Sequence, residues 1–131
     1  MFLYLRAVII PTEPIGSVPR PPKLVDALTA SGPDAPVAAA LEALFDDAVS
    51  DTIRRFEATG SPIITDGEQR KPSFATYPVH GLTNLGPGGI AIPFKDIRQR
   101  QLPVLTRGPF RYATYASAYL DRARRITNRP L

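Results

Sequence analysis

The clearest pattern of apolar and polar positions runs from Pro36 to Ala58. Apolar side chains recur there at spacings of three and four residues, which gathers them on one face of a helix, while charged residues fall mostly on the other face. The positions on the apolar face are Val37, Leu41, Leu44, Phe45, Ala48, Thr52, Ile53 and Phe56. Because Gly60 supplies a helix stop, the pattern predicts a long helix over residues 36–58.

Two short β-branched runs flank this helix. The first lies within Arg6–Thr12 and the second within Pro62–Thr65, and each has the composition of a strand buried on both faces. The second run stops at an acidic tip, Asp66-Gly67-Glu68. Ligands of parallel α/β folds bind at the carboxyl ends of strands, so this tip and the loop after the first run are the candidate site.

The rest of the chain is organised around proline and glycine. We expect a short helix at Lys23–Ala30 and a long excursion over Pro72–Pro103, in which Ile90–Ile92 pairs with Leu102–Leu105 as a hairpin. A final helix is predicted at Arg111–Arg125. Alternation of strands and helices indicates an α/β fold with a parallel sheet and right-handed crossovers. A full barrel needs eight βα units, so we expect a partial (β/α)8 TIM-barrel-like fold of about two units plus a loop or hairpin insertion.

Composition narrows the classes of protein to which this chain can belong. The length of 131 residues predicts a single, partial domain over residues 1–131. The chain has no cysteine and only one histidine, His80, which excludes disulfides and any thiolate or multi-histidine metal site within it. No apolar run approaches the roughly 20 residues that cross a bilayer, and the start lacks the features of a secretory signal. We therefore expect a soluble, cytoplasmic protein with no membrane partner.

Charge is distributed unevenly along the chain. Residues 1–94 hold seven basic and ten acidic side chains, a net charge of −3, whereas residues 95–131 hold nine basic and two acidic ones, a net charge of +7. A basic segment of this kind would suit nucleic acid or another anionic surface. It lacks the interleaved aromatic and basic residues typical of single-strand binders, so a solvated helix face or pairing with the acidic half is the favoured interpretation.

Two stretches carry a resemblance to a known family. They are Ile15-Gly16-Ser17-Val18-Pro19-Arg20 and Ile64-Thr65-Asp66-Gly67-Glu68-Gln69-Arg70-Lys71. With both in this order around a long helix, the chain resembles the cobalamin-independent methionine synthase family, in the N-terminal part of its catalytic barrel. Thr59–Pro62 and Gly108–Tyr112 look like the short, single-barrel members of that family. The resemblance extends from about Thr12 to Arg125, so the chain is expected to be a truncated barrel.

The resemblance implies methyl transfer from methyltetrahydrofolate to the thiol of homocysteine, giving methionine, with zinc activating the thiol as a thiolate. The residues matching Ile15, Gly16 and Ser17 would hold the amino-acid end of the substrate, and Glu68 would pair with its ammonium group. The family's zinc ligands, a histidine, two cysteines and a glutamate, are carried on later strands. We therefore assign no catalytic or metal-binding residue, give His80 no ligand role, and expect this chain alone to be inactive.

Structural interpretations of the same residues stay open. Glu68 could interact with a helix start, and Ser17 could cap the following helix. Asp66 is favoured as a turn residue. Arg20 is favoured as an ion-pair partner of Glu13 or Asp26 rather than as a binder of an anion such as the folate tail.

Two other functions also remain. One is a non-catalytic interaction module that docks another chain, or self-associates, through an exposed sheet edge. The other is a related barrel, a cobamide-dependent methyltransferase or a porphyrinogen decarboxylase relative.

Overall fold

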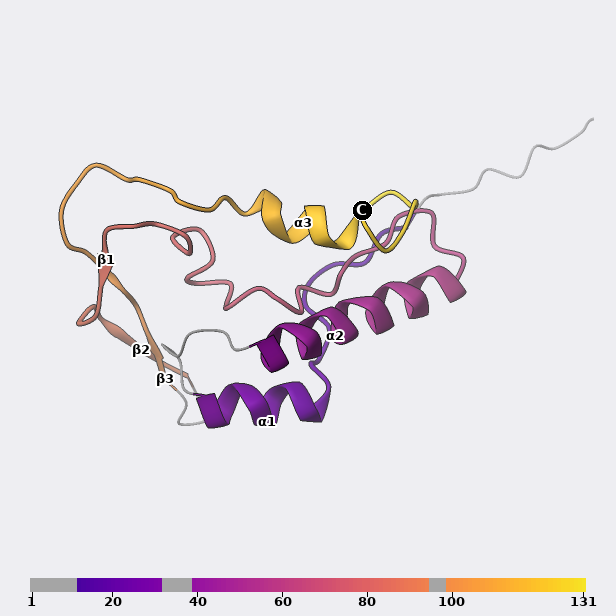
Figure 1. Cartoon of the computed structure of the whole chain (residues 1–131), viewed down its shortest axis with the longest axis horizontal. Helices are drawn as coiled ribbons and strands as arrows, with labels where there is room; N and C mark the ends of the chain where they lie inside the picture. The colour runs from indigo at the N-terminus through magenta and orange to yellow at the C-terminus, as the bar shows by residue number, and fades with distance from the viewer. Residues whose placement is uncertain (1–11, 32–38, 95–98) are drawn as a thin grey trace, which may run out of the picture. The chain divides into compact units, whose positions relative to one another are not determined.

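A computed structural model describes residues 12–31, 39–94 and 99–131 of the chain. These residues form a mixed α/β structure of three helices and two small antiparallel sheets, drawn in Figure 1. By its contacts the chain divides into two compact units. Unit 1 comprises the described residues up to Gln69 together with Ala123–Leu131, and unit 2 comprises those from Arg70 to Arg122. The prediction of one domain over residues 1–131 stays a prediction.

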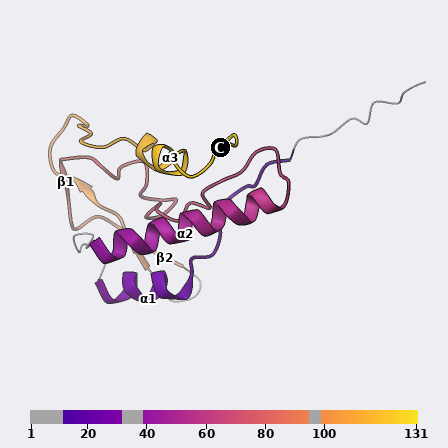
Figure 2. The same ribbon diagram turned by 45° about the vertical axis from the view of Figure 1, so that its right-hand side comes forward.

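Two helices build unit 1. Helix α1 spans Pro22–Ser31 and helix α2 spans Ala39–Ala58, and the two lie side by side in Figures 1 and 2. Pro22 suits the first position of α1 because its missing N–H would have no partner inside the helix anyway. Gly60 follows α2 with a φ of +75°, and its N–H donates to the Glu57 carbonyl, which closes the helix. Both predicted helices are confirmed where they are described; residues 36–38 lie outside the described residues.

The apolar face of α2 divides its contacts between two clusters. Its first half packs against α1, and its second half packs against segments from much later in the chain. The first cluster contains Leu24, Leu41, Phe45 and Ala48, and the second contains Val49, Ile53, Ile64 and Ala123. Ile53 has no exposed surface at all. Helix α2 therefore contributes to both apolar clusters of unit 1.

The prediction of a strand at Pro62–Thr65 is wrong for the described residues. Residues 62 and 63 form a bend, and Ile64 is buried, but its N–H donates to the carbonyl of Pro130 rather than to a parallel neighbour. Proline has no N–H to return such a bond, so no ladder grows from this contact. Most of its expected neighbour, Arg6–Thr12, lies outside the described residues. The parallel sheet of a barrel is thus not observed in the part described.

Unit 2 contains two short antiparallel pairs. Strand β1 (Leu85–Gly86) pairs with β4 (Val104–Leu105), and β2 (Ala91–Pro93) pairs with β3 (Gln99–Gln101). A hairpin was expected between residues 90–92 and 102–105. The Leu102 N–H does donate to the Ile90 carbonyl at 3.0 Å, but the strand that pairs with β2 is β3, which lies before the expected run. Ala91 faces Gln101, and residues 104–105 return to β1 instead. Pro103, which lacks an N–H, separates the two pairings.

Helix α3 spans only Ser117–Ala123, and the predicted helix at 111–125 is therefore too long. The residues before α3 are tied to the segment around Gly81 by backbone hydrogen bonds. Thr83 donates to the Arg111 carbonyl at 2.9 Å, and Ala113 donates to the Gly81 carbonyl at 2.8 Å. This extended contact competes with helix formation and delays the start of α3.

Candidate functional site

The two sequence motifs are joined directly by hydrogen bonds within unit 1. The Val18 N–H donates to the Gly67 carbonyl at 3.0 Å, and the Gln69 side-chain Nε2 donates to the Val18 carbonyl at 3.2 Å. The Arg20 Nε donates to the backbone carbonyl of Gln69 at 2.9 Å. We call these three bonds the inter-motif clamp. They join residues that are 49 to 51 positions apart in the sequence.

The acidic tip forms a turn that its own side chains stabilise. Asp66 Oδ1 accepts the Glu68 N–H at 2.9 Å, and Thr65 Oγ1 accepts the Gly67 N–H at 3.2 Å. The turn role predicted for Asp66 is confirmed. Gly67 and Glu68 both have positive φ angles, +67° and +54°. Glu68 is the one described non-glycine residue in this left-handed region, which costs a side-chain-bearing residue free energy.

Gly67 is required by a close approach as well as by its backbone angle. A Cβ at this position would lie 2.8 Å from Thr52 Cγ2 and 3.0 Å from Val18 Cβ. The turn is therefore pressed against both α2 and the first motif. No residue with a side chain fits there without a shift of its neighbours.

The four predicted binding residues lie on either side of the clamp. Ser17 directly precedes Val18, and Glu68 lies between Gly67 and Gln69, so each is one residue away from an inter-motif hydrogen bond. Ile15 is 94% exposed, and Gly16 has a φ of +84° with open space around it. Ser17 is exposed and Glu68 is half-buried. The assignment of these residues to substrate binding stays a prediction.

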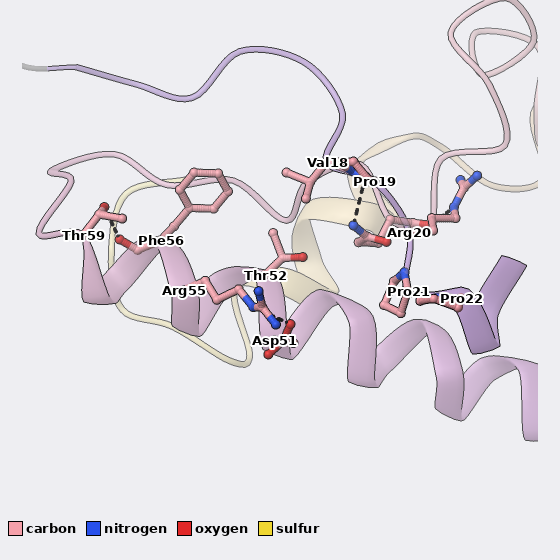
Figure 3. A pocket seen from close by; sticks show the side chains of 11 residues that line it. Val18, Pro19, Arg20, Pro21, Pro22, Asp51, Thr52, Arg55, Phe56 and Thr59 are labelled. Atoms are coloured by element: carbon pink, nitrogen blue, oxygen red, sulfur yellow. Dashed lines mark hydrogen bonds and ion pairs between the residues drawn. The ribbon is translucent and has the colours of Figure 1, made fainter.

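A hollow of about 470 Å³ adjoins the clamp in unit 1. Figure 3 shows it between the loop of the first motif and the second half of α2. Its lining is mostly apolar, and the Asp51–Arg55 ion pair, at 2.7 Å, belongs to it. The lining residues are Val18, Pro19, Arg20, Pro21, Pro22, Asp51, Thr52, Arg55, Phe56, Thr59 and Gln69. None of the four predicted residues lines it, although Val18 and Gln69 are their immediate neighbours.

Sequence reasoning missed the role of two residues in this region. For Arg20 the sequence indicated an ion pair with Glu13 or Asp26, which stays a prediction, and it gave no sign that the Arg20 Nε donates to the Gln69 carbonyl. Gln69 was quoted only as part of the second motif, yet its residue surface is just 1% exposed. A glutamine between charged residues is typical of an exposed position, so the local sequence held no signal of its burial.

Unit 2 has a polar pair of its own. The Tyr119 hydroxyl and the His80 Nδ1 lie 2.7 Å apart, and the two rings stack at a centroid distance of 6.3 Å. Burial raises the pKa of the Tyr119 hydroxyl, and the nearby positive charge of Arg70 opposes part of that rise. His80, to which we assigned no ligand role, thus makes a hydrogen bond to Tyr119 through its Nδ1.

The donor set for the zinc site that the resemblance implies does not fit this chain. The sequence has no cysteine to supply thiolates. Among the described residues, no group of three or more His, Cys, Asp or Glu side chains is placed to hold a metal ion. We therefore derive no chemical step through zinc.

Comparisons with known proteins do not assign the chain to a family. No family model matches it, and no curated protein matches it significantly. No helix within the described ranges combines the length and apolar character needed to cross a membrane.

Proposed function

We propose that this chain carries the amino-acid-binding part of a methyltransferase of the homocysteine type, in a partial β/α barrel. The observation that carries the proposal is the inter-motif clamp. Two motifs that were singled out from the sequence for opposite ends of one substrate meet through one backbone hydrogen bond, from the Val18 N–H to the Gly67 carbonyl, and through two side-chain bonds from Gln69 and Arg20. Ser17 and Glu68 are each one residue from that contact, which supports their assignment to the two ends of one small zwitterion.

The chemistry of the two sides is complementary to a free amino acid. A carboxylate group requires hydrogen-bond donors, which the Ser17 hydroxyl and backbone N–H groups near it offer. An ammonium group requires an acceptor with negative charge, which Glu68 offers. Homocysteine and its product methionine share these two groups, so both are expected ligands. In the full family, methyltetrahydrofolate would supply the methyl group.

The proposal assigns binding and orientation to these residues, not turnover. Activation of a thiol by zinc needs ligands that this sequence does not contain. We expect the chain to bind homocysteine and methionine without transferring a methyl group by itself.

A titration of the 131-residue chain with L-homocysteine and L-methionine, followed by calorimetry and by amide chemical shifts, tests this proposal. Glu68→Gln and Ser17→Ala each remove one charge-assisted hydrogen bond, worth about 1.5–3 kcal/mol, so each should weaken binding by roughly 10- to 100-fold. Glu13→Gln is the matched control, because it removes an exposed carboxylate from the same region of the chain. Absence of binding by the unmodified chain, or equal effects of the Glu68 and Glu13 variants, would contradict the proposal.

A second candidate function is an interaction module without catalysis, and the exposed apolar side chains of unit 2 favour it. Ile90, Phe74, Tyr115 and Phe110 are between 64% and 77% exposed. Each sheet has two strands, so every described strand pairs along one edge only. Such surfaces promote association. Light scattering over a range of concentrations tests it: growth of the particle mass supports self-association, whereas a constant monomer mass argues against it.

A further inference from the structure

Gln69 is the most deeply buried polar residue among the described residues of unit 1. Its residue surface is 1% exposed, and it belongs to the largest fully buried side chains among the described residues. It is connected to the first motif at two points. Its side-chain Nε2 donates to the Val18 carbonyl, and its backbone carbonyl accepts from the Arg20 Nε.

We expect the Gln69 carboxamide to contribute little net stability to the fold. Only the nitrogen end makes a hydrogen bond, whereas Oε1 is buried and has no hydrogen-bond partner among the described residues. A buried acceptor that loses its water without gaining a partner destabilises the fold, and this loss offsets the gain from the Nε2 bond. An unbranched apolar side chain of similar size would satisfy the packing equally well.

The hydrogen bond from Nε2 has a specific geometric consequence. The N–H of Val18 is held by the Gly67 carbonyl, and the C=O of Val18 is held by Gln69. Both backbone polar groups of Val18 are thus attached to the second motif. These two attachments fix the orientation of the Val18 backbone, and Ser17 is the residue directly before Val18.

We infer that Gln69 is the positioning residue of the proposed amino-acid site, because its carboxamide sets the orientation of the Ser17 backbone relative to Glu68. This inference rests on the proposed function, since it concerns the same substrate. Gln69 acts through Val18 and does not itself touch the substrate. We therefore expect the site to lose affinity for the amino acid when the Gln69 carboxamide is removed, even though the fold is retained.

The test is Gln69→Met, which keeps an unbranched side chain of similar volume and removes both polar groups. We expect the dissociation constant of L-methionine to rise at least about tenfold. Hydrogen exchange of the Val18 N–H should accelerate, because its bond to Gly67 is no longer held in alignment. The midpoint of thermal unfolding should stay unchanged or rise. If the Met variant does not fold, Gln69→Asn retains the carboxamide on a stem too short to reach Val18 and should give the same two losses.

Leu24→Val provides the matched control, because Leu24 is equally buried in the first cluster and makes no part of the clamp. It should lower the unfolding midpoint and leave both the methionine affinity and the Val18 exchange rate unchanged. Unchanged affinity and unchanged Val18 exchange in the Gln69 variant would overturn the inference. If the unmodified chain binds no amino acid, the proposed function fails, whereas the Val18 exchange rate still decides whether Gln69 holds the clamp.

Discussion

Replacement of Gly67 by alanine is the sharpest test of the contact between the two motifs. The new Cβ would lie 2.8 Å from Thr52 Cγ2, 3.0 Å from Val18 Cβ and 3.1 Å from Val18 Cγ2. Ordinary contacts between carbon atoms lie near 3.5–4.0 Å. Thr52 is a buried, β-branched residue of α2, and Val18 Cβ is attached to the backbone that makes the clamp. Relief of the clash therefore requires movement of Val18 away from Gly67.

Two unfavourable contributions and one favourable contribution determine the magnitude. Alanine in the left-handed region costs about 1–2 kcal/mol, and overpacking of a buried site costs about 1–3 kcal/mol. The smaller conformational freedom of alanine in the unfolded chain returns about 0.4–1 kcal/mol. We expect Gly67→Ala to lower the free energy of unfolding by about 1–4.5 kcal/mol.

Gly60→Ala is the control that measures the backbone strain alone, so the difference between the two variants gives the steric part of the effect. Gly60 has a similar φ of +75°, but a Cβ there meets nothing within 4 Å. Only the backbone strain remains, so the expected cost is under about 1.5 kcal/mol. Urea unfolding followed by far-ultraviolet circular dichroism, with equal slopes for both variants, measures the difference. Equal destabilisation by the two substitutions would refute the close approach of Gly67 to Val18 and Thr52.

Two further predictions concern the second cluster of unit 1 and the polar pair of unit 2. Ile53→Ala should lower the free energy of unfolding by about 2–5 kcal/mol, whereas Ile15→Ala, at an exposed position, should change it by under about 0.5 kcal/mol; comparable effects in urea unfolding would disprove the burial of Ile53. Burial raises the folded-state pKa of Tyr119 above its usual value of 10.0. The neutral hydroxyl is therefore favoured in the fold, and its contribution to stability is lost as pH rises from that value through the raised pKa. Unfolding midpoints of Tyr119→Phe should decline less over this range, and identical alkaline profiles would contradict the reasoning.

The helices of unit 1 could be predicted because their signal is local and repeated. In α2, many apolar positions agree on one face, and Gly60 marks the end. Val49 was not among the expected core positions. It is buried because Ile64 and Ala123 cover that side of the helix, and these residues come from distant parts of the chain. Periodicity places a face, but the width of the buried area depends on what packs against it.

The strands were less predictable because strand formation depends on a neighbour. Ile63, Ile64 and Thr65 have strong β propensity, yet they form no ladder. The Ile64 N–H donates to the Pro130 carbonyl, and the Ile63 carbonyl accepts from the Ser61 hydroxyl. The Thr65 hydroxyl accepts from the Gly67 N–H. Side-chain hydrogen bonds of this type replace a ladder locally. The burial of Ile64 agrees with the prediction, whereas the strand and its pairing do not.

The candidate site was predictable only in part, for a related reason. Glycine and aspartate in the second motif indicate a turn from local chemistry, and the structure has that turn. The clamp depends on bonds from Gln69 and Arg20 to backbone carbonyls about 50 residues away. A backbone carbonyl is present at every position, so no residue type in the sequence identifies the partner.

The conformation of Glu68 connects the turn to the proposed site. A left-handed glutamate costs about 1–2 kcal/mol, and the bond from its N–H to Asp66 recovers about 0.5–1.5 kcal/mol. The turn alone is thus close to balance and would not hold this conformation firmly. The clamp holds it, because Gly67 on one side and Gln69 on the other are both bonded to the first motif. For a turn that only reverses the chain, glycine or asparagine would adopt the same angle at less cost. Strain at a carboxylate that the surrounding bonds keep in place is instead typical of a functional group held for a ligand, which favours the role proposed for Glu68.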